Sequence, residues 1–101
     1  MAAQDRQFDN AMVQIYLRAK AECGYNATRF LQMLTEHGGL GTAKRLLASD
    51  ETQYGFTELW ERGRLDLTVE AHVLKAEFEG LFPDEERQRA RSRLKAHGYE
   101  P

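Results

Sequence analysis

Apolar and polar residues alternate along this chain with the period of an α-helix. In six stretches apolar side chains recur at steps of three and four residues, which places them on one face of a helix. No β-hairpin signal is present. The pattern therefore predicts an all-α fold, a compact bundle of five or six short helices in a single domain over residues 1–101. The helices are expected at residues 5–23, 26–37, 42–48, 57–62, 68–78 and 83–97.

The expected helix ends carry residues that satisfy the free backbone groups there. Asn26, Thr57 and Thr68 are predicted N-caps, because their side-chain oxygens accept a backbone N–H of the first turn. Pro83 fits the first position of the last helix, where its missing N–H costs nothing. Glycines follow several of the helices, at Gly24, Gly38, Gly63 and Gly98.

Residues 54–74 hold the densest apolar spacing and the only tryptophan of the chain. We expect this stretch to be the hub on which the other helices pack. The core residues of the hub are predicted to be Phe56, Leu59, Trp60, Leu65, Leu67, Val69, Val73 and Leu74. Arg64 and Asp66 are the first candidates for a buried ion pair within it.

Composition narrows the class of protein. The chain has 101 residues, of which 42% are hydrophobic and 30% charged, so one domain with one core is expected. No apolar run approaches the roughly 20 residues that span a bilayer, and the first residues lack the pattern of a signal peptide. Cys23 is the only cysteine, which excludes an internal disulfide and a cysteine-based zinc cluster. A cytoplasmic protein without a membrane segment or a cofactor is predicted.

The first predicted helix has a wide apolar arc. Phe8, Met12, Ile15 and Ala19 recur along one face, and further apolar residues broaden it. An arc of this width predicts contact with more than one neighbour, either inside the domain or across an interface. These four residues are the predicted surface for a protein partner or for a second copy of the chain.

A glycine-rich step, Gly38 to Gly41, precedes the third predicted helix. Glycines before a helix allow backbone N–H groups to approach a phosphate. The step resembles the loop of the helix-hairpin-helix DNA-binding family, from which it differs by lacking two residues between the second glycine and the threonine. The matching residues are Gly39, Gly41, Thr42, Ala43 and Leu46. A plain turn between two helices is the alternative interpretation.

The last predicted helix carries five cations after three acids. Arg87, Arg91 and Lys95 fall on one stripe, and Lys44 and Arg45 of the third helix add charges that would follow a phosphate backbone. Yet acids open the helix, it has no aromatic side chain for base stacking, and the net charge of the chain is -2. Nucleic-acid binding and a solvated helix face are the two interpretations.

The sequence contains no motif of a metal site or of a catalytic site. His37, His72 and His97 lie on separate segments without a paired metal-binding spacing, so no metal site is predicted. The carboxylates around Arg62 and Arg64 are expected to hold a corner between helices, since no nucleophile motif accompanies them. No catalytic residue is predicted, and the chain is expected not to be an enzyme.

Residues 26–99 resemble a small, functionally uncharacterised bacterial helical domain. The resemblance is carried by Ala27 to Leu34, Gly38-Gly39 with Ala43, Leu46 and Leu47, GFTELWERGRLDLTVEAHVL from Gly55, Leu81-Phe82, Glu85-Glu86 and Arg91 to Tyr99. It implies a domain that occurs alone or attached to larger proteins, some of them nuclease- or restriction-like, and that has an accessory role such as the handling of foreign DNA. Residues 1–25 lie outside it. The expected function is an accessory module that binds a protein partner, with nucleic acid as the alternative.

Overall fold

The computed structural model describes residues 3–49 and 54–100, which are helical and contain no strand. The elements in order are α1 (Ala3–Cys23), α2 (Thr28–Ala48), α3 (Tyr54–Glu61), the 3₁₀ helix η1 (Leu65–Leu67), α4 (Val69–Val73), the 3₁₀ helix η2 (Ala76–Leu81) and α5 (Asp84–Ala96). The all-α prediction is confirmed. Within the described part of the chain, none of the helices combines the length and the apolar character that crossing a bilayer requires.

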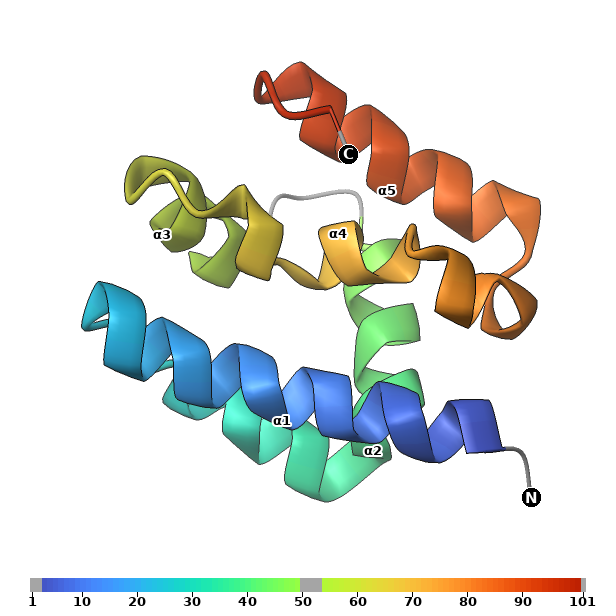
Figure 1. Cartoon of the computed structure of the whole chain (residues 1–101), viewed down its shortest axis with the longest axis horizontal. Helices are drawn as coiled ribbons and strands as arrows, with labels where there is room; N and C mark the ends of the chain where they lie inside the picture. The colour runs from blue at the N-terminus through green and yellow to red at the C-terminus, as the bar shows by residue number, and fades with distance from the viewer. Residues whose placement is uncertain (1–2, 50–53, 101) are drawn as a thin grey trace.

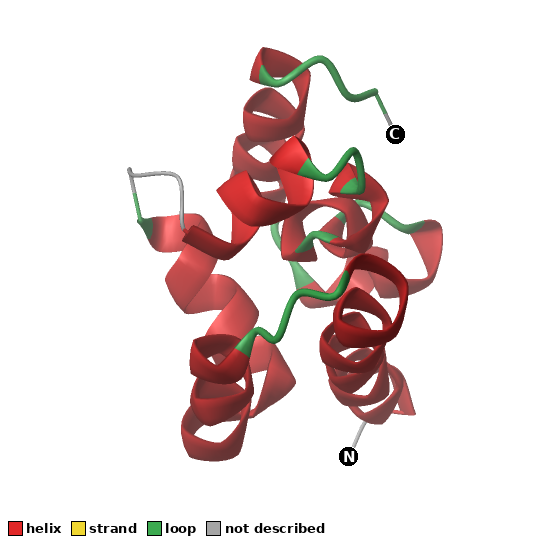
Figure 2. Ribbon diagram, turned by 90° about the vertical axis from the view of Figure 1, so that its left-hand side faces the viewer, coloured by secondary structure: helices red, strands yellow, loops and turns green. Residues whose placement is uncertain are grey.

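The helices are arranged in layers. α1 and the first half of α2 lie side by side at the bottom of Figure 1, α3 and α4 lie above them, and α5 covers α4. The second half of α2 turns away from α1 and runs upward to α5 (Figure 1). The side view places the N-terminus beside the lower layer and the C-terminus beside the upper one (Figure 2). α2 therefore links the two ends of the bundle.

Gly38 is the point at which α2 changes direction. Its φ of 73° and ψ of 174° interrupt the helix, a conformation that glycine adopts at little steric cost. The next residue, Gly39, packs directly on α1, where its N–H donates to Asp9 Oδ1 at 2.9 Å. The predicted break at Gly38 is confirmed, but the following helical segment begins at Gly39, earlier than the predicted start near Gly41 and Thr42. The reason is that Asp9, from another helix, acts as the cap.

The main core is organised around Phe8 of α1. Its ring is fully buried and meets the rings of Phe78 and Phe82 edge to face, at centroid distances of 5.0 and 5.2 Å. The other buried members of this cluster are Met12, Ile15, Ala43, Leu47, Val69, Val73 and Ala90. Truncating a buried phenylalanine costs about 3–5 kcal/mol. α1 is therefore an integral part of the core.

The predicted hub is buried except at its tryptophan. Six of its members are buried and Leu74 is half-buried. Trp60 is 46% exposed, and its ring stands edge-on to that of His97 at 5.0 Å. α3 lies at the edge of the bundle (Figure 1), so only the side that carries Phe56 and Leu59 is covered. The prediction that the indole belongs to the core is wrong.

One of the three predicted N-caps is formed. The Thr68 hydroxyl accepts the Ala71 N–H at 3.2 Å and caps α4, as predicted. α2 begins without a side-chain cap, because the Asn26 carboxamide oxygen instead accepts the Tyr16 hydroxyl at 2.9 Å. Thr57 lies inside α3, which begins earlier than expected. The prediction for Asn26 is wrong because a side chain of another helix, Tyr16, binds its oxygen. The prediction for Thr57 is wrong because α3 already begins at Tyr54.

Candidate functional site

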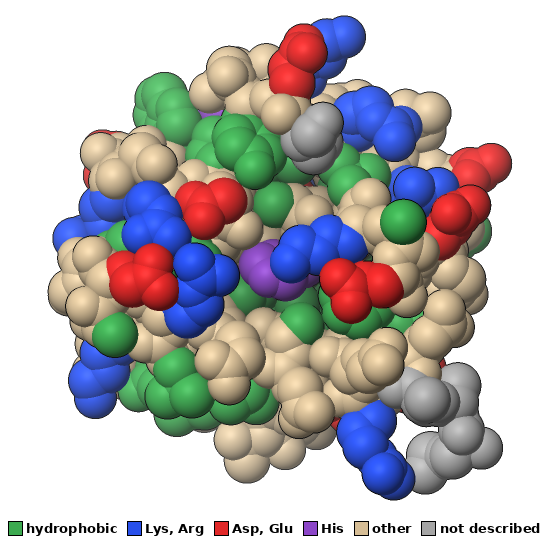
Figure 3. Space-filling view, viewed as in Figure 1, with side chains coloured by type: hydrophobic (Ala, Val, Ile, Leu, Met, Phe, Trp, Pro, Cys, Tyr) green, Lys and Arg blue, Asp and Glu red, His purple; other side chains and the backbone are tan. Residues whose placement is uncertain are grey.

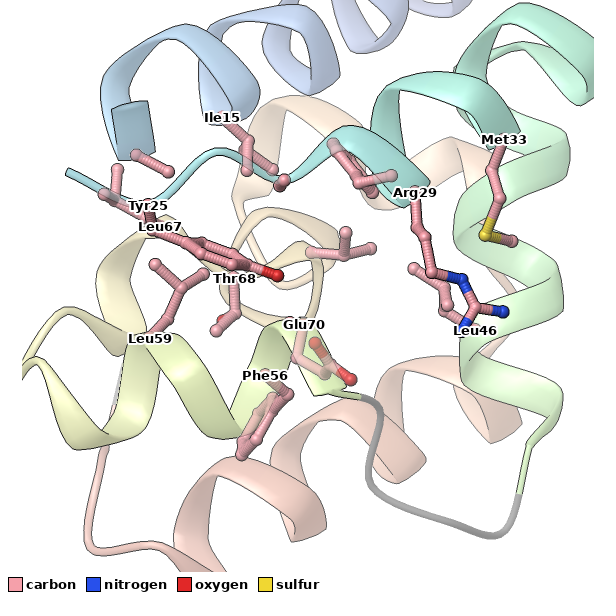
Figure 4. A pocket seen from close by; sticks show the side chains of 15 residues that line it. Ile15, Tyr25, Arg29, Met33, Leu46, Phe56, Leu59, Leu67, Thr68 and Glu70 are labelled. Carbon is pink, nitrogen blue, oxygen red and sulfur yellow. The ribbon is translucent and has the colours of Figure 1, made fainter. Parts of the chain in front are cut away.

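An apolar pocket of about 120 Å³ lies between α1, the start of α2 and the layer formed by α3, η1 and α4 (Figure 4). Most of its wall is aliphatic or aromatic. These residues are Ile15, Ala19, Ala27, Phe30, Met33, Leu46, Phe56, Leu59, Leu67 and Val69. Polar groups reach it from Tyr25, Arg29, Thr68 and Glu70. A concave, mainly apolar site with a few polar groups is the usual form of a binding pocket.

The turn between α1 and α2 brings Tyr25 to the apolar pocket. Gly24, with φ of 68°, ends α1, and the Tyr25 N–H then donates to the Ala19 carbonyl at 3.1 Å. Arg62 holds the tyrosine ring, because its guanidinium lies 5.6 Å from the ring centroid and donates to the Cys23 carbonyl at 2.8 Å. In Figure 4 the Tyr25 ring lies beside Leu59 with its hydroxyl inside the pocket.

Glu70 contributes a carboxylate that already forms an ion pair with Arg93. It is 3% exposed, and Arg93 Nη1 donates to its Oε2 at 2.8 Å. The same guanidinium donates to the carbonyl groups of Leu46 and Ser49 at 3.2 and 2.7 Å. Because an unpaired buried carboxylate is strongly destabilising, this wall of the apolar pocket depends on the contact with α5.

Arg29 contributes a cation that forms no ion pair among the described residues. It lies in the first turn of α2 and is exposed to solvent, and among the described residues it joins no ion pair or hydrogen bond. The first turn of α2 contains no acidic side chain and no side-chain cap. Since Glu70 is paired and Arg29 is not, the apolar pocket presents a net positive charge to an occupant.

The four residues predicted to dock a partner lie inside the protein, which corrects that prediction. They are at most 4% exposed: Phe8, Met12, Ile15 and Ala19. The wide arc of α1 is thus covered by the chain's own helices, although Ile15 and Ala19 border the apolar pocket. The large apolar side chains that α1 does expose are Val13 and Leu17, on its other face. Figure 3 shows apolar surface over α1 and α2 at its lower left.

The glycine-rich step is not open to a phosphate. Gly39 N–H binds the Asp9 carboxylate, which would also repel an approaching anion. Thr42 is fully buried, and Gly41 is half-buried against His37. The prediction that Gly39, Gly41 and Thr42 form a phosphate-binding loop is therefore wrong, and the alternative of a close-packed turn between helices describes it.

Two of the five cations predicted to contact nucleic acid are engaged in the fold. Lys44 Nζ lies 2.7 Å from Glu86 Oε1. Arg87 is half-buried and faces Asp84 at 4.0 Å. The other three are exposed: Arg45, Arg91 and Lys95. The continuous basic stripe expected along α5 is therefore interrupted.

Arg89 and Arg93 of α5 bind the end of α2. Arg89 donates to the carbonyl groups of Leu47 and Ala48 at 3.1 and 3.3 Å, next to those that Arg93 binds. The last carbonyl groups of a helix have no partner within it. The two arginines supply these partners, so they hold α5 on α2.

Arg64 joins two acids at the surface near the apolar pocket. It donates to Asp66 at 3.0 Å and to Glu22 at 2.8 Å, and Arg18 also binds Glu22 at 2.9 Å. Hydrogen bonds from Arg18 and Arg64 lower the pKa of Glu22 to about 2, and the hydrogen bond from Arg64 lowers the pKa of Asp66. The predicted pair of Arg64 with Asp66 exists, but these side chains are 28% and 44% exposed, so it is not buried. On the side of the molecule that Figure 3 shows, Lys and Arg side chains lie among Asp and Glu side chains.

The histidines remain apart, and no group of three metal-binding side chains meets among the described residues. Burial lowers the pKa of His72, whose Nδ1 lies 2.8 Å from the Thr68 carbonyl. Because a carbonyl only accepts, Nδ1 carries the proton of the neutral ring. His97 packs against Phe56 at 4.8 Å, and His37 is exposed.

Sequence reasoning missed the polar residues of the apolar pocket. The spacing of Tyr25, Arg29 and Glu70 along the chain matches no motif of a known binding site. One signal was present, because an arginine at the start of a helix opposes the helix dipole. The chain matches no protein family model, no curated protein and no solved structure.

Proposed function

We propose that this chain is a non-enzymatic binding module of the cytoplasm that receives an aliphatic side chain of a protein partner in the apolar pocket. The observation that carries this proposal is an apolar wall around a volume of about 120 Å³. An apolar cavity of about 150 Å³ holds benzene, so the smaller volume suits a branched aliphatic group such as that of leucine or valine. Buried anchors of this kind supply much of the affinity of protein interfaces. A lone cysteine fits the reducing cytoplasm.

The polar groups of the apolar pocket favour binding over catalysis. The Thr68 hydroxyl donates to the Leu65 carbonyl at 2.6 Å and accepts from Ala71, so it is not activated as a nucleophile. The Glu70 carboxylate is held by Arg93 and is not available as a base. Beside these two groups, an occupant meets the apolar wall, the ring and hydroxyl of Tyr25, and the charge of Arg29.

A titration with N-acetyl-leucine amide, followed by amide chemical shifts in NMR spectra, tests the proposal. Saturable shifts are expected at residues of the pocket wall, including Ala27 and Leu59. Ala27→Leu should abolish them by filling the space, whereas Ala21→Leu, the same change at an exposed position of α1, should leave them intact. The proposal is wrong if the wild type shows no saturable shift at millimolar probe, or if Ala27→Leu binds as well as Ala21→Leu.

A further inference from the structure

We propose that the occupant of the apolar pocket is the C-terminal residue of a partner protein, an aliphatic residue whose terminal carboxylate binds Arg29. This inference rests on the proposed function and adds the chemical identity of the group that enters. The pocket volume selects the aliphatic side chain, and the unpaired cation selects the acid. Neither feature alone would distinguish a chain end from an internal apolar residue.

Charge is the first step of the argument. Two charged side chains line the apolar pocket, Arg29 and Glu70. Arg93 pairs with Glu70 at 2.8 Å, whereas Arg29 has no ion pair among the described residues. In Figure 4 the Arg29 side chain extends from α2 along the pocket toward Leu46. A ligand that enters the apolar space therefore meets one uncompensated charge, which is positive.

The position of Arg29 is the second step. The helix dipole makes the first turn of α2 positive, so a cation there is in an unfavourable place and an anion in a favourable one. No acid of that turn compensates Arg29. A carboxylate bound at this rim would interact favourably with the guanidinium and with the helix dipole together. A cation in the first turn does not stabilise α2, whereas it would stabilise a bound acidic ligand.

Geometry favours a chain end over an acidic side chain. In a C-terminal leucine or valine, the aliphatic group and the carboxylate are attached to the same Cα. A fixed short separation between an apolar anchor and an anion is what a small pocket with one rim cation recognises. An internal peptide would place the acid and the apolar side chain on different residues and would lose more conformational freedom on binding. A free branched-chain acid has the same chemistry and is separated from a chain end by experiment.

The test compares four probes: N-acetyl-leucine, its amide, isovalerate, and the peptide acetyl-Gly-Gly-Gly-Leu with a free C-terminus. The two leucine acids should bind at least about threefold more tightly than the amide, because the ion pair is partly exposed and of moderate strength. Arg29→Gln should remove this preference while leaving affinity for the amide unchanged. Arg91→Gln, at an exposed arginine of α5, should preserve it. Added salt should weaken binding of the acids more than that of the amide.

The outcomes separate this inference from the proposed function. If no probe binds, both fail. If the amide binds as tightly as the acids, or if folded Arg29→Gln keeps the preference, the carboxylate assignment fails and the aliphatic pocket stands. If isovalerate binds as tightly as the tetrapeptide, the occupant is a small free acid and the assignment to a partner's C-terminus is overturned. Circular dichroism of each variant shows that it is folded.

Discussion

Replacing Arg93 by methionine should remove a large part of the stability of this protein. The Arg93 and Glu70 side chains are only 11% and 5% exposed, and Arg93 also binds two carbonyl groups at the end of α2. Removing one partner of a buried ion pair costs about 3–5 kcal/mol, because the other charge is left unpaired. The two lost carbonyl contacts add to this, and the apolar methionine recovers part of the packing of the arginine stem.

A loss of about 4 kcal/mol is a large fraction of the roughly 5–15 kcal/mol by which domains are stable. In a domain of about 100 residues, each kcal/mol of lost stability lowers the melting temperature by about 4–8 °C. The melting temperature of Arg93→Met should therefore fall by about 15 °C or more. Urea unfolding followed by circular dichroism measures the change in free energy. Fluorescence of Trp60, the only tryptophan, gives a second probe that tests whether unfolding is two-state.

The matched control is Arg91→Met, at an exposed position on the same helix, which should change stability by less than about 0.5 kcal/mol. Glu70→Met should be destabilising as well, because it leaves Arg93 without its carboxylate. The double variant Glu70→Met/Arg93→Met should cost less than the sum of the two single changes, since it leaves neither charge unpaired. If Arg93→Met and Arg91→Met unfold at the same urea concentration, the buried pair does not hold α5 in place.

Gly39→Ala should destabilise by about 1–3 kcal/mol in urea unfolding, since the methyl group would lie 2.5 Å from Asp9 Oδ1 and 2.9 Å from Asp9 Cα; an unchanged midpoint would contradict the packing of α2 on α1. Thr42→Val should stabilise by about 1 kcal/mol, because among the described residues its buried hydroxyl has no hydrogen-bond partner. A loss of stability would show that this hydroxyl is bonded. Burial lowers the folded-state pKa of His72, so the unfolded chain binds more protons, and stability present above pH 6.5 should be lost as pH falls toward the folded pKa. His72→Gln should remove this dependence of stability on pH, measured as urea unfolding midpoints across the pH range. The stability that Glu22 contributes is lost at lower pH, between pH 4.5 and about 2. If the dependence below pH 6.5 persists in His72→Gln, another group causes it.

Local patterns predicted the parts of the fold that depend on neighbours in the sequence. The spacing of Phe8, Met12 and Ile15 places them on one apolar face of α1, because every third or fourth residue of a helix faces the same way. Gly38 and Thr68 marked a helix break and a helix start through properties of a single residue. These features required no knowledge of what lies opposite.

Features that depend on distant contacts could not be predicted in this way. An apolar stripe does not reveal whether it is covered by its own chain or by a partner, so the arc of α1 suggested an interface where the structure has a core. The cap of the second half of α2 is Asp9, which is 30 residues away in sequence. The dense apolar spacing of residues 54–74 predicts that Trp60 is inside, yet α3 lies where little covers that side.

Arg93 and Arg29 show how the groups around an arginine in the fold determine whether its charge is paired. Sequence places Arg93 among the cations of a basic helix and gives Arg29 no particular role. In the structure Arg93 lies against the free carbonyl groups of α2 and a buried carboxylate, all of which it binds. Arg29 lies at the opposite end of α2, where the helix presents free N–H groups and no acid. A helix end that is negative holds its cation in the fold, whereas an end that is positive leaves its cation free for an external anion. This asymmetry makes Arg93 part of the fold and leaves Arg29 exposed at the apolar pocket, without an ion pair among the described residues.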